Sequence, residues 1–382
     1  MKMKTILIFD VEVSGHHLEY IHHLHCLASQ SKDKFIFCLP NEFIKVKAQF
    51  EWEQSDNIIF DLFNYNNQST SYSSILNSSY KKCKILKKYT KKYNPSNIFL
   101  ISLMHFLPFL PFILSPKTKV SGIIYQIYLY RWKSSKYTTK CSDIIKYILL
   151  TFANCIQKVY ILNDRPASII LNRIYHTHKY TFIPDPFIPV KINPIEIINR
   201  QSLEIDKYKI IFLHMGDMRK RKGTLDILDS ISYINTNLQS KLCFIFAGKI
   251  SDEIKDSFYK KCAQISKNIQ IIVFDQFCDY RFLASLCSLS DYMLIPYKFV
   301  NQSSGIIGYS AQFQLPVIGP KEGLIGKLIK RYKLGYTIPN INHLSIAEFL
   351  NNNPLSNNRK DISNKYLTDN NVESFLSSIQ FD

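Results

Sequence analysis

Short apolar runs rich in β-branched residues alternate with helical stretches along most of the chain. In the first half these runs are TILIFDV, DKFIFCLP, SNIFLISL, VSGIIYQIY and KVYILND. Continuous apolar runs of this length are typical of buried parallel strands. Strands that alternate with helices indicate βαβ units, in which helices cover both faces of a parallel sheet. The first half is therefore expected to form an α/β domain.

A proline-rich break divides the chain in two. Four prolines lie between Pro184 and Pro194, and such a cluster ends regular structure. The same rhythm then restarts with YKIIFLHMG, KLCFIFAG, IQIIVFDQF, DYMLIPY and LPVIGP. We therefore expect a first domain over residues 1–187, a linker over 188–207 and a second α/β domain over 208–345. Residues 346–382 are expected to form a helical tail that packs back on the first domain.

The composition narrows the class of protein. The chain has 382 residues, 46% hydrophobic and 20% charged, as expected for about two globular domains. Nine cysteines without a CxxC pair argue against a disulfide framework or zinc site and favour a reducing compartment. The first apolar run meets Asp10 and Glu12 without a cleavage site, which favours a strand over a signal peptide. In Ile98–Leu114, Pro108 and Pro111 favour a strand and loop over a membrane span.

The chain is strongly basic, with a formal net charge of +18. Such an excess favours an anionic partner: a phosphorylated substrate, an acidic membrane surface or nucleic acid. Lys81–Lys92 combines seven lysines with Ile85, Leu86 and Tyr89, a pattern typical of a helix that binds an anionic membrane surface. A solvated helix face is the alternative. Since the standard nucleic-acid-binding motifs are missing, we expect no nucleic-acid partner.

Two loops of the second half have residues suited to phosphate. In HMGDMRKRKGTLDIL, four basic residues, Arg219–Lys222, separate the strand-end Gly216 from Gly223, which opens a helix. Cationic side chains beside the free N–H groups of a helix N-terminus bind phosphate. In NQSSGIIGYSAQFQ, Ser303 and Ser304 suit a helix N-cap before Gly305, whose backbone a ligand can approach. A solvated basic turn and an ordinary capped helix are the respective alternatives.

The order of these motifs resembles the second domain of the GT-B glycosyltransferases, especially family 4. The Lys-Gly pair is followed by CFIFAG, SDYMLIPY, SSGIIGYSAQ, LPVI and EGLIGKLI. The resemblance is strong over Lys209–Gly335 and weaker over Met1–Pro186. It implies an α/β protein with the GT-B fold, two Rossmann-like domains facing across a cleft. It also implies a retaining glycosyltransferase of the hexosyltransferase class. Such an enzyme would move a sugar from a nucleotide-diphosphate donor to a glycan or lipid-linked acceptor in bacterial surface polysaccharide synthesis.

The resemblance assigns donor-binding roles in the second domain. Lys222 matches the lysine that neutralises the donor diphosphate. The family often has an arginine where this chain has Asp217, so Arg219 or Arg221 would supply that charge. The backbone that would cover the sugar and diphosphate comprises Ser303, Ser304, Gly305 and Ile306.

Two family residues are replaced in this chain. The family's two glutamates fall on Asn301 and Tyr309, which would still be donor-binding residues. Neither is a carboxylate, so the contact that the family's second glutamate makes with the ribose is missing, and the Tyr309 hydroxyl offers a substitute. Glu322, after LPVIGPK, is a further candidate for donor or acceptor contact.

Three elements of the first domain are also candidates. SGHHLEYI resembles the family's loop facing the donor phosphates, with Gly15 at the turn and His16 as a donor-binding residue. His105 follows the third strand, where the family often has an active-site histidine, and is the expected catalytic residue. A polar cap or a core partner is the alternative for each histidine. Asp164, after Asn163, is expected to cap the next helix, because Pro166 suits a first helical turn.

The resemblance also implies a mechanism. Lys/Arg side chains and helix N-termini would stabilise the leaving diphosphate in place of a metal, so no metal or cofactor besides the nucleotide sugar is expected. Attack on the face of departure would retain the configuration, and the departing phosphate would help to deprotonate the acceptor. A GT-B epimerase or phosphorylase is one alternative, and a catalytically inactive nucleotide-sugar-binding protein is another, favoured by Asn301 and Tyr309. A cytoplasmic location is expected, free or peripheral on the inner face of the cell membrane.

Overall fold

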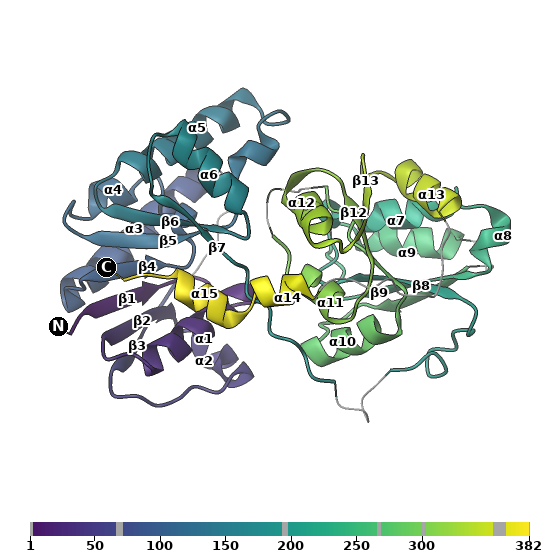
Figure 1. Ribbon diagram of the computed structural model, residues 1–382, viewed down its shortest axis with the longest axis horizontal. Coiled ribbons are helices and arrows are strands. Elements are labelled where there is room, and N and C mark those ends of the chain that lie inside the picture. The colour runs from purple at the N-terminus through teal and green to yellow at the C-terminus, as the bar shows by residue number, and fades with distance from the viewer. Residues whose placement is uncertain are drawn as a thin grey trace. The chain divides into compact units, whose positions relative to one another are not determined.

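The computed structural model describes residues 3–65, 72–192, 198–265, 269–298, 301, 303–353 and 364–381. Its internal contacts divide the chain into two units (Figure 1). Unit 1 contains Met1–Pro186 and Val372–Asp382, and unit 2 contains Phe187–Asn371. The C-terminal residues therefore belong to unit 1, although unit 2 precedes them in the sequence.

Unit 1 is built on a parallel seven-stranded sheet of order β3-β2-β1-β4-β5-β6-β7. Its strands are β1 (Thr5–Phe9), β2 (Lys34–Pro40), β3 (Ile58–Phe63), β4 (Asn97–Leu100), β5 (Lys119–Ile124), β6 (Ile156–Leu162) and β7 (Tyr180–Ile183). The five strands predicted from the sequence are present. The two that were not predicted, β3 and β7, form the edges of the sheet. Several of their side chains are only partly buried, although β3 (IIFDLF) is as apolar in sequence as the predicted strands.

Helices cover both faces of this sheet. They are α1 (His16–Ser29), α2 (Phe43–Val46), η1 (Lys47–Gln49), α3 (Tyr72–Tyr93), η2 (Leu103–Phe106), α4 (Leu110–Ile113), η3 (Tyr128–Arg131), α5 (Tyr137–Phe152), α6 (Arg165–Ile174) and α15 (Val372–Ser378). On one face, α3, α4, α5 and α6 pack in one cluster with Leu7 and Phe9 of β1. On the other, α1, α2 and α15 pack with Ile6 and Ile8. Successive residues of β1 thus serve opposite cores.

Unit 1 contains the two segments, Ile98–Leu114 and Lys81–Lys92, that the sequence analysis considered for contact with a membrane. The stretch Ile98–Leu114 forms β4, η2 and α4, and no helix in the described ranges is long and apolar enough to cross a membrane. Lys81–Lys92 lies within α3, where Leu86 and Tyr89 are buried in the core. The exposed side of that segment is therefore made of lysines, and its most apolar residues support the fold.

Unit 2 has a parallel six-stranded sheet of order β10-β9-β8-β11-β12-β13. Its strands are β8 (Ile210–Met215), β9 (Leu242–Ala247), β10 (Gln270–Phe274), β11 (Tyr292–Leu294), β12 (Val317–Pro320) and β13 (Gly335–Ile338). The sequence predicted all but β13, another edge strand. The helices are η5 (Lys220–Lys222), α7 (Thr224–Ile231), α8 (Thr236–Gln239), α9 (Lys255–Gln264), α10 (Tyr280–Leu289), α11 (Ile306–Gln312), α12 (Gly323–Tyr332), α13 (His343–Asn352) and α14 (Lys365–Asp369).

The described residues of the expected linker belong to unit 2, whereas the expected C-terminal tail is shared between unit 2 and unit 1. Arg200, from the segment expected to link the domains, donates to Asp291 Oδ2 at 2.9 Å and to the Lys209 carbonyl at 2.7 Å. It therefore holds this segment beside the start of β8 in unit 2. In the expected tail, α13 packs on α7 within unit 2, whereas α15 packs on α1 and β7 within unit 1.

Candidate functional site

The carboxyl end of β8 in unit 2 carries the basic loop predicted from the sequence. Gly216 follows β8 with a φ of +89°, and a Cβ at this position would lie 3.2 Å from Lys222 Nζ and 3.5 Å from Ile306 Cδ1. The structure thus brings Lys222 of η5 and Ile306 of α11 to one strand end. Ligands of open α/β sheets bind at this end of the strands.

Three cations of the loop, Lys220, Arg221 and Lys222, have no acidic side-chain partner within the described residues. Lys222 Nζ lies 5.3 Å from the ring centroid of Tyr297, and neither Lys222 nor Arg221 forms an ion pair there. The acids nearest in sequence are occupied, because Asp226 pairs with Lys298 at 2.8 Å and Asp217 pairs with Arg219. Arg219 is exposed and neutralised by that contact. The cations of the loop that remain available to an anion are therefore Arg221 and Lys222, which are half-buried, and Lys220, which is exposed.

His214 fixes the loop to the sheet and was not recognised from the sequence. Its Nδ1–H donates to the Leu294 carbonyl at 2.9 Å, so its Nε2 accepts from the Thr224 hydroxyl at 2.9 Å. Burial lowers the pKa of His214 to about 4, and the imidazole is neutral near pH 7. The position was detectable in principle, as a lone histidine two residues before the strand-end Gly216.

The second predicted loop, which precedes α11, does not supply the expected side-chain cap of that helix. Helix α11 begins after Gly305, and no side-chain hydrogen bond caps it among the described residues. The expected N-cap role of Ser303 and Ser304 is therefore wrong, because the helix starts beyond both hydroxyls. Ser303, Ser304 and Gly305 are half-buried. Since α11 has only seven residues, the field of its N-terminus is weak support for an anion site.

The two positions that replace glutamates are both buried. Asn301 is 9% and Tyr309 7% exposed. The Tyr309 ring packs edge-on against Phe187, with ring centroids 5.3 Å apart. Tyr309 therefore contributes to the packing of α11 within unit 2.

In unit 1, the predicted loop after β1 directs a different histidine inward. Gly15 has a φ of +54° and precedes α1, with open space where a Cβ would lie. His16 is exposed, and its ring lies 3.1 Å from Glu19 Oε2. His17 is turned toward the end of β1, where it meets Asp10 and Glu12. The structure thus places His17, and not His16, among the groups at the sheet edge.

Asp10, Glu12, His17, Lys82 and His105 form a polar group that we call the histidine cluster. Asp10 is fully buried, and its Oδ1 accepts from the Val11 N–H at 2.7 Å and the Glu12 N–H at 3.2 Å. Since its other carboxylate oxygen can only accept, His17 Nδ1–H donates to Asp10 Oδ2 at 2.6 Å. His17 Nε2 lies 3.3 Å from Glu12 Oε2. The carboxylates of Asp10 and Glu12 therefore both contact the imidazole of His17.

The two histidines of the cluster differ in their charge. Burial opposes the charged form of His17, but the attraction and hydrogen bond of Asp10, aided by Glu12, outweigh it and raise the pKa. For His105, burial lowers the pKa to about 4, and the positive charge of Lys82 acts in the same direction. The cluster therefore pairs a histidine that favours the charged form with a neutral one.

Lys82 is the unexpected member of the cluster. Unlike the exposed lysines around it in α3, it is 6% exposed, and its Nζ lies 5.9 Å from the ring centroid of Tyr65. Burial lowers its pKa, while Glu12 and Asp10 act to raise it. The sequence carried no signal for this, because Lys82 lies in a run of seven similar lysines. Asp10 could have been found as a polar residue directly after a buried strand, and His17 as a histidine at the start of the next helix.

Two further residues named from the sequence lie at helix starts. Asp164 caps α6 by accepting from the Ala167 N–H at 3.0 Å, which confirms the expected capping role. Glu322 is the N-cap residue of α12, but its side chain makes no capping bond among the described residues.

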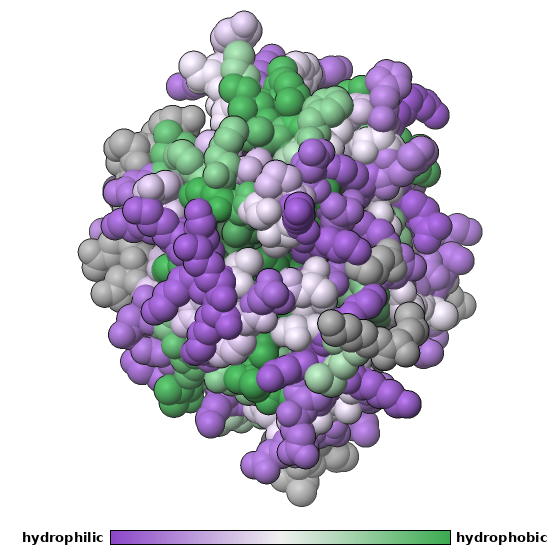
Figure 2. Space-filling model, turned by 90° about the vertical axis from the view of Figure 1, so that its left-hand side faces the viewer, coloured by the Kyte–Doolittle hydropathy of each residue, from purple (hydrophilic) through white to green (hydrophobic). Residues whose placement is uncertain are grey.

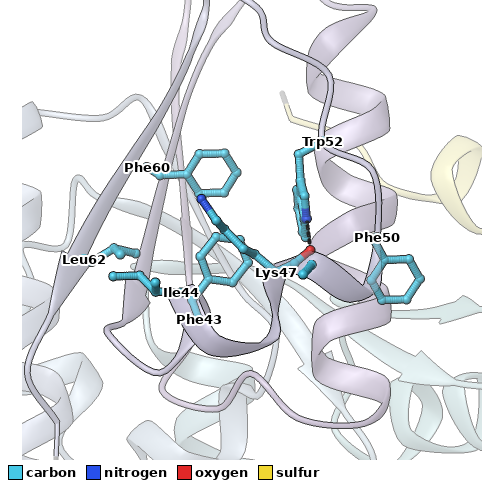
Figure 3. Close-up of a pocket in the computed structure, with 8 residues that line it drawn as sticks. Phe43, Ile44, Lys47, Phe50, Trp52, Phe60 and Leu62 are labelled. Atoms are coloured by element: carbon cyan, nitrogen blue, oxygen red, sulfur yellow. Dashed lines mark hydrogen bonds between the residues drawn. The ribbon is translucent and has the colours of Figure 1, made fainter. Parts of the chain in front are cut away.

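An apolar pocket of about 390 Å³ is lined by residues of α2, η1 and β3 (Figure 3). Phe43, Ile44, Phe60 and Leu62 lie on one side, Trp52 and Phe50 on the other, and Lys47 between them. The Trp52 indole N–H donates to the Lys47 carbonyl at 2.7 Å. With one charged side chain in an apolar lining, this pocket suits a hydrocarbon or aromatic group and not a nucleotide diphosphate.

Comparisons with known proteins concern the fold. No protein-family model matches the chain, and no curated protein matches its sequence. Solved structures match over nearly the full length. A glycosyltransferase from Rickettsia africae has a TM-score of 0.62 at 15% identity, covering 99% of this chain and 97% of its own. HepE from Anabaena, in complex with UDP and glucose, has a TM-score of 0.64 at 13% identity, covering 98% and 93%. A trehalose-phosphate synthase (UDP-forming) from Burkholderia vietnamiensis has a TM-score of 0.70 at 9% identity, covering 98% of both chains.

The chain has the GT-B fold. Two parallel α/β sheets of seven and six strands, matched over whole chains, confirm the fold predicted from the order of motifs. In this GT-B protein the basic loop lies in unit 2 and the histidine cluster in unit 1, each at the carboxyl end of its sheet.

Proposed function

We propose that this GT-B protein is a retaining, family 4-like glycosyltransferase. It moves a sugar from a nucleotide-diphosphate donor to a glycan or lipid-linked acceptor in bacterial surface polysaccharide synthesis. One observation carries the proposal: Lys222 Nζ lies over the Gly216 strand end, and neither Lys222 nor Arg221 is ion-paired within the described residues. Unpaired cations at the carboxyl end of a parallel sheet are suited to a diphosphate.

In the proposed reaction, unit 2 holds the leaving group. The bond between the sugar's anomeric carbon and the diphosphate oxygen breaks, and negative charge grows on the diphosphate. Lys222 and Arg221 stabilise this charge, which lowers the barrier because they interact more strongly with the transition state than with the donor. The acceptor oxygen bonds to the anomeric carbon on the same face, and its proton passes to the departing phosphate. Each electron pair and proton is then accounted for.

Unit 1 contributes the histidine cluster to the proposal. Near pH 7 the neutral His105 imidazole has one nitrogen that donates and one that accepts, so it can bind a sugar hydroxyl in either direction. We keep His105 as the proposed catalytic histidine. Asp10 and Glu12 hold His17 in one orientation, so His17 is a positioning residue beside it. Gly15 and His16 remain proposed donor-binding residues, as do Asn301, Ser303, Ser304, Gly305, Ile306 and Tyr309.

A matched pair of variants tests the donor site. Lys222→Ala should weaken UDP binding by about tenfold to a hundredfold, the range for losing one charge-assisted hydrogen bond. UDP is the first probe because the Anabaena structure contains it. Lys220→Ala, an exposed neighbour in the same turn, removes equal charge and should change binding little. Isothermal titration calorimetry of both variants decides, and equal losses would reject a specific contact of Lys222.

A binding protein without catalysis is the second candidate. Asn301 and Tyr309 replace two carboxylates, and Tyr309 is packed against Phe187. If UDP-sugars bind but no nucleotide is released with any glycan or lipid-linked acceptor, this second function holds. Release of UDP that depends on acceptor supports the glycosyltransferase.

The partner and location expected from the sequence belong to the same proposal. A lipid-linked acceptor would place the enzyme at the cytoplasmic face of the membrane. The exposed lysines of Lys81–Lys92 would face its anionic lipids, although Leu86 and Tyr89 pack inside unit 1. The apolar pocket beside Lys47 offers space for a hydrocarbon group of such an acceptor.

A further inference from the structure

Lys82 of α3 is buried without an acidic or hydrogen-bonding partner among the described residues. Lysine side chains usually project into solvent, and Figure 2 shows hydrophilic side chains spread across the surface that it draws. Lys81 and Lys84 of the same helix are exposed in this way. Lys82 is 6% exposed, and its Nζ lies 5.9 Å from the Tyr65 ring centroid. A buried charge without a partner is destabilising, so the packing of unit 1 does not explain Lys82.

The acids closest to Lys82 are directed at another residue. Burial lowers the pKa of Lys82, whereas attraction by Glu12 and Asp10 acts to raise it. One oxygen of each acid contacts the His17 imidazole, at 2.6 Å from Asp10 and 3.3 Å from Glu12. The other oxygen of Asp10 accepts from two backbone N–H groups. The three N–H donors of the Lys82 ammonium group are therefore left without an acceptor in the described part of the chain.

Two further polar atoms at the carboxyl end of this sheet are buried, and neither has a hydrogen-bond partner within the described ranges. They are Nδ1 of His105, which follows β4, and the hydroxyl oxygen of Tyr125, which follows β5. Strand β4 lies between β1 and β5, so both residues come from strand ends next to that of Asp10. The Tyr125 and His17 ring centroids are 5.5 Å apart. Buried polar groups without a partner are uncommon and indicate a missing ligand or water.

We propose that Lys82 binds an anionic group of the sugar acceptor, with His105 and Tyr125 as further hydrogen-bond donors. The acceptor is then a sugar or glycan end that carries a carboxylate or a phosphate. Such a group supplies the acceptor oxygens that the three side chains lack, and a charge-assisted hydrogen bond is about twice as strong as a neutral one. The ammonium group is a compact charge with rotatable donors, so it suits either anion.

Since an acceptor belongs to the proposed sugar transfer, this assignment rests on the proposed function. A structural role is the alternative, in which Lys82 stabilises the buried charges of Asp10 and Glu12. The two roles predict opposite changes in stability. If Lys82 serves a ligand, Lys82→Met removes an unpaired buried charge and should raise the urea midpoint of the free protein. If Lys82 supports the two acids, the midpoint should fall.

NMR titration of the full chain tests the assignment. The side-chain signals of His105 and His17 are followed as glucuronate, glucose 6-phosphate, glucose or inorganic phosphate is added. We expect at least one acidic sugar to bind about tenfold or more tighter than glucose. Lys82→Met should weaken that binding by about tenfold to a hundredfold, the range for losing one charge-assisted hydrogen bond. Lys81→Met, which removes the same charge from an exposed position of α3, is the matched control and should bind like the wild type.

The two acidic sugars distinguish the sources of the anion. Glucuronate alone indicates a carboxylate, and glucose 6-phosphate alone indicates a phosphate. Four results would overturn the assignment: Lys82→Met that binds the acidic sugars like the wild type, Lys82→Met with a lowered urea midpoint, a wild type that binds glucose as tightly as the acids or binds none of the sugars, and inorganic phosphate that binds as tightly as glucose 6-phosphate. The comparison of sugars uses the wild type, so it decides even where a variant fails to fold.

UDP calorimetry keeps this assignment apart from the proposed function. Intact UDP binding without a preference for acidic sugars rejects the role of Lys82 and leaves the donor site of unit 2 standing. Missing UDP binding rejects that donor site, whichever sugars unit 1 binds.

Discussion

Neighbouring charges set the protonation of His17 in unit 1. Its imidazole is buried, which by itself favours the neutral form, yet Asp10 and Glu12 raise its pKa. The raised pKa of His17 determines how the free energy of unfolding depends on pH. The pair's contribution to the free energy of unfolding is complete below the unfolded pKa of 6.5 and is lost as pH rises through the raised pKa. This loss belongs to the range above pH 6.5.

Asp10→Asn should reverse the direction of that shift. Without the charge of Asp10, burial dominates over the remaining attraction of Glu12, and the pKa of His17 should fall below 6.5. An NMR titration of the histidine side chains measures this directly. His105 serves as the internal reference, because it should stay neutral down to a pH of about 4 in both proteins. A His17 pKa that is the same in both would show that Asp10 does not hold the imidazolium.

At the residue scale, the sequence identified groups whose neighbours are local. Lys222 and Gly216 were found because only five residues of one loop separate them, and the loop returns on itself. The histidine cluster draws Lys82 and His105 from far along the chain to the end of β1. Residue spacing along the sequence cannot predict such a contact, because the contact depends on the order of the strands in the folded sheet.

The helix α11 is held close to the first residues of unit 2. The backbone N–H of Val190 donates to Gln312 Oε1 at 2.9 Å, and Gln312 Nε2 donates to the Val190 carbonyl at 2.7 Å. Phe187 occupies the space beside Gly308, where a Cβ would lie 2.1 Å from its ring. The helix approaches this closely only because position 308 lacks a side chain.

Gly308→Ala should therefore destabilise the protein by about 1–3 kcal/mol through overpacking. The sign is diagnostic, because the same change at an uncrowded helix position stabilises by up to about 1 kcal/mol. Urea denaturation gives the free energy of unfolding for Gly308→Ala, Phe187→Leu and the double variant. We expect the double variant to cost less than the sum of the single ones, since the smaller side chain leaves room for the methyl group. Additive costs would argue against a direct clash.

At the element scale, the sequence predicted every strand that is flanked by two neighbours, and one edge strand, β10, as well. All five strands predicted in unit 1 are flanked by two neighbours, whereas β3 and β7 at the edges were not predicted. In unit 2 the edge strand β10 was predicted, and the edge strand β13 was not. An edge strand pairs with one neighbour only, and that pairing is a contact that the sequence does not show.

For the whole molecule, the chain does not divide into two contiguous halves. After unit 2 it returns to unit 1, where α15 lies beside α1 (Figure 1). Phe375 of α15 is fully buried, and its ring stacks on Tyr20 with centroids 5.4 Å apart. Tyr20 in turn donates its hydroxyl to Asp185 Oδ1 at 2.6 Å. The last residues thus complete the core on one face of the first sheet.

Phe375→Ala should destabilise unit 1 by about 3–5 kcal/mol, the usual cost of removing a fully buried phenylalanine. Since this core belongs to unit 1, the amides of β1 and β2 should lose hydrogen-exchange protection, while those of β8 and β9 keep theirs. Phe258→Ala, which removes a fully buried phenylalanine from the core of unit 2, should give the opposite pattern. If Phe375→Ala weakened protection equally in both sheets, the two units would unfold together. Unchanged protection of β1 would show that α15 adds little to the stability of the sheet it covers.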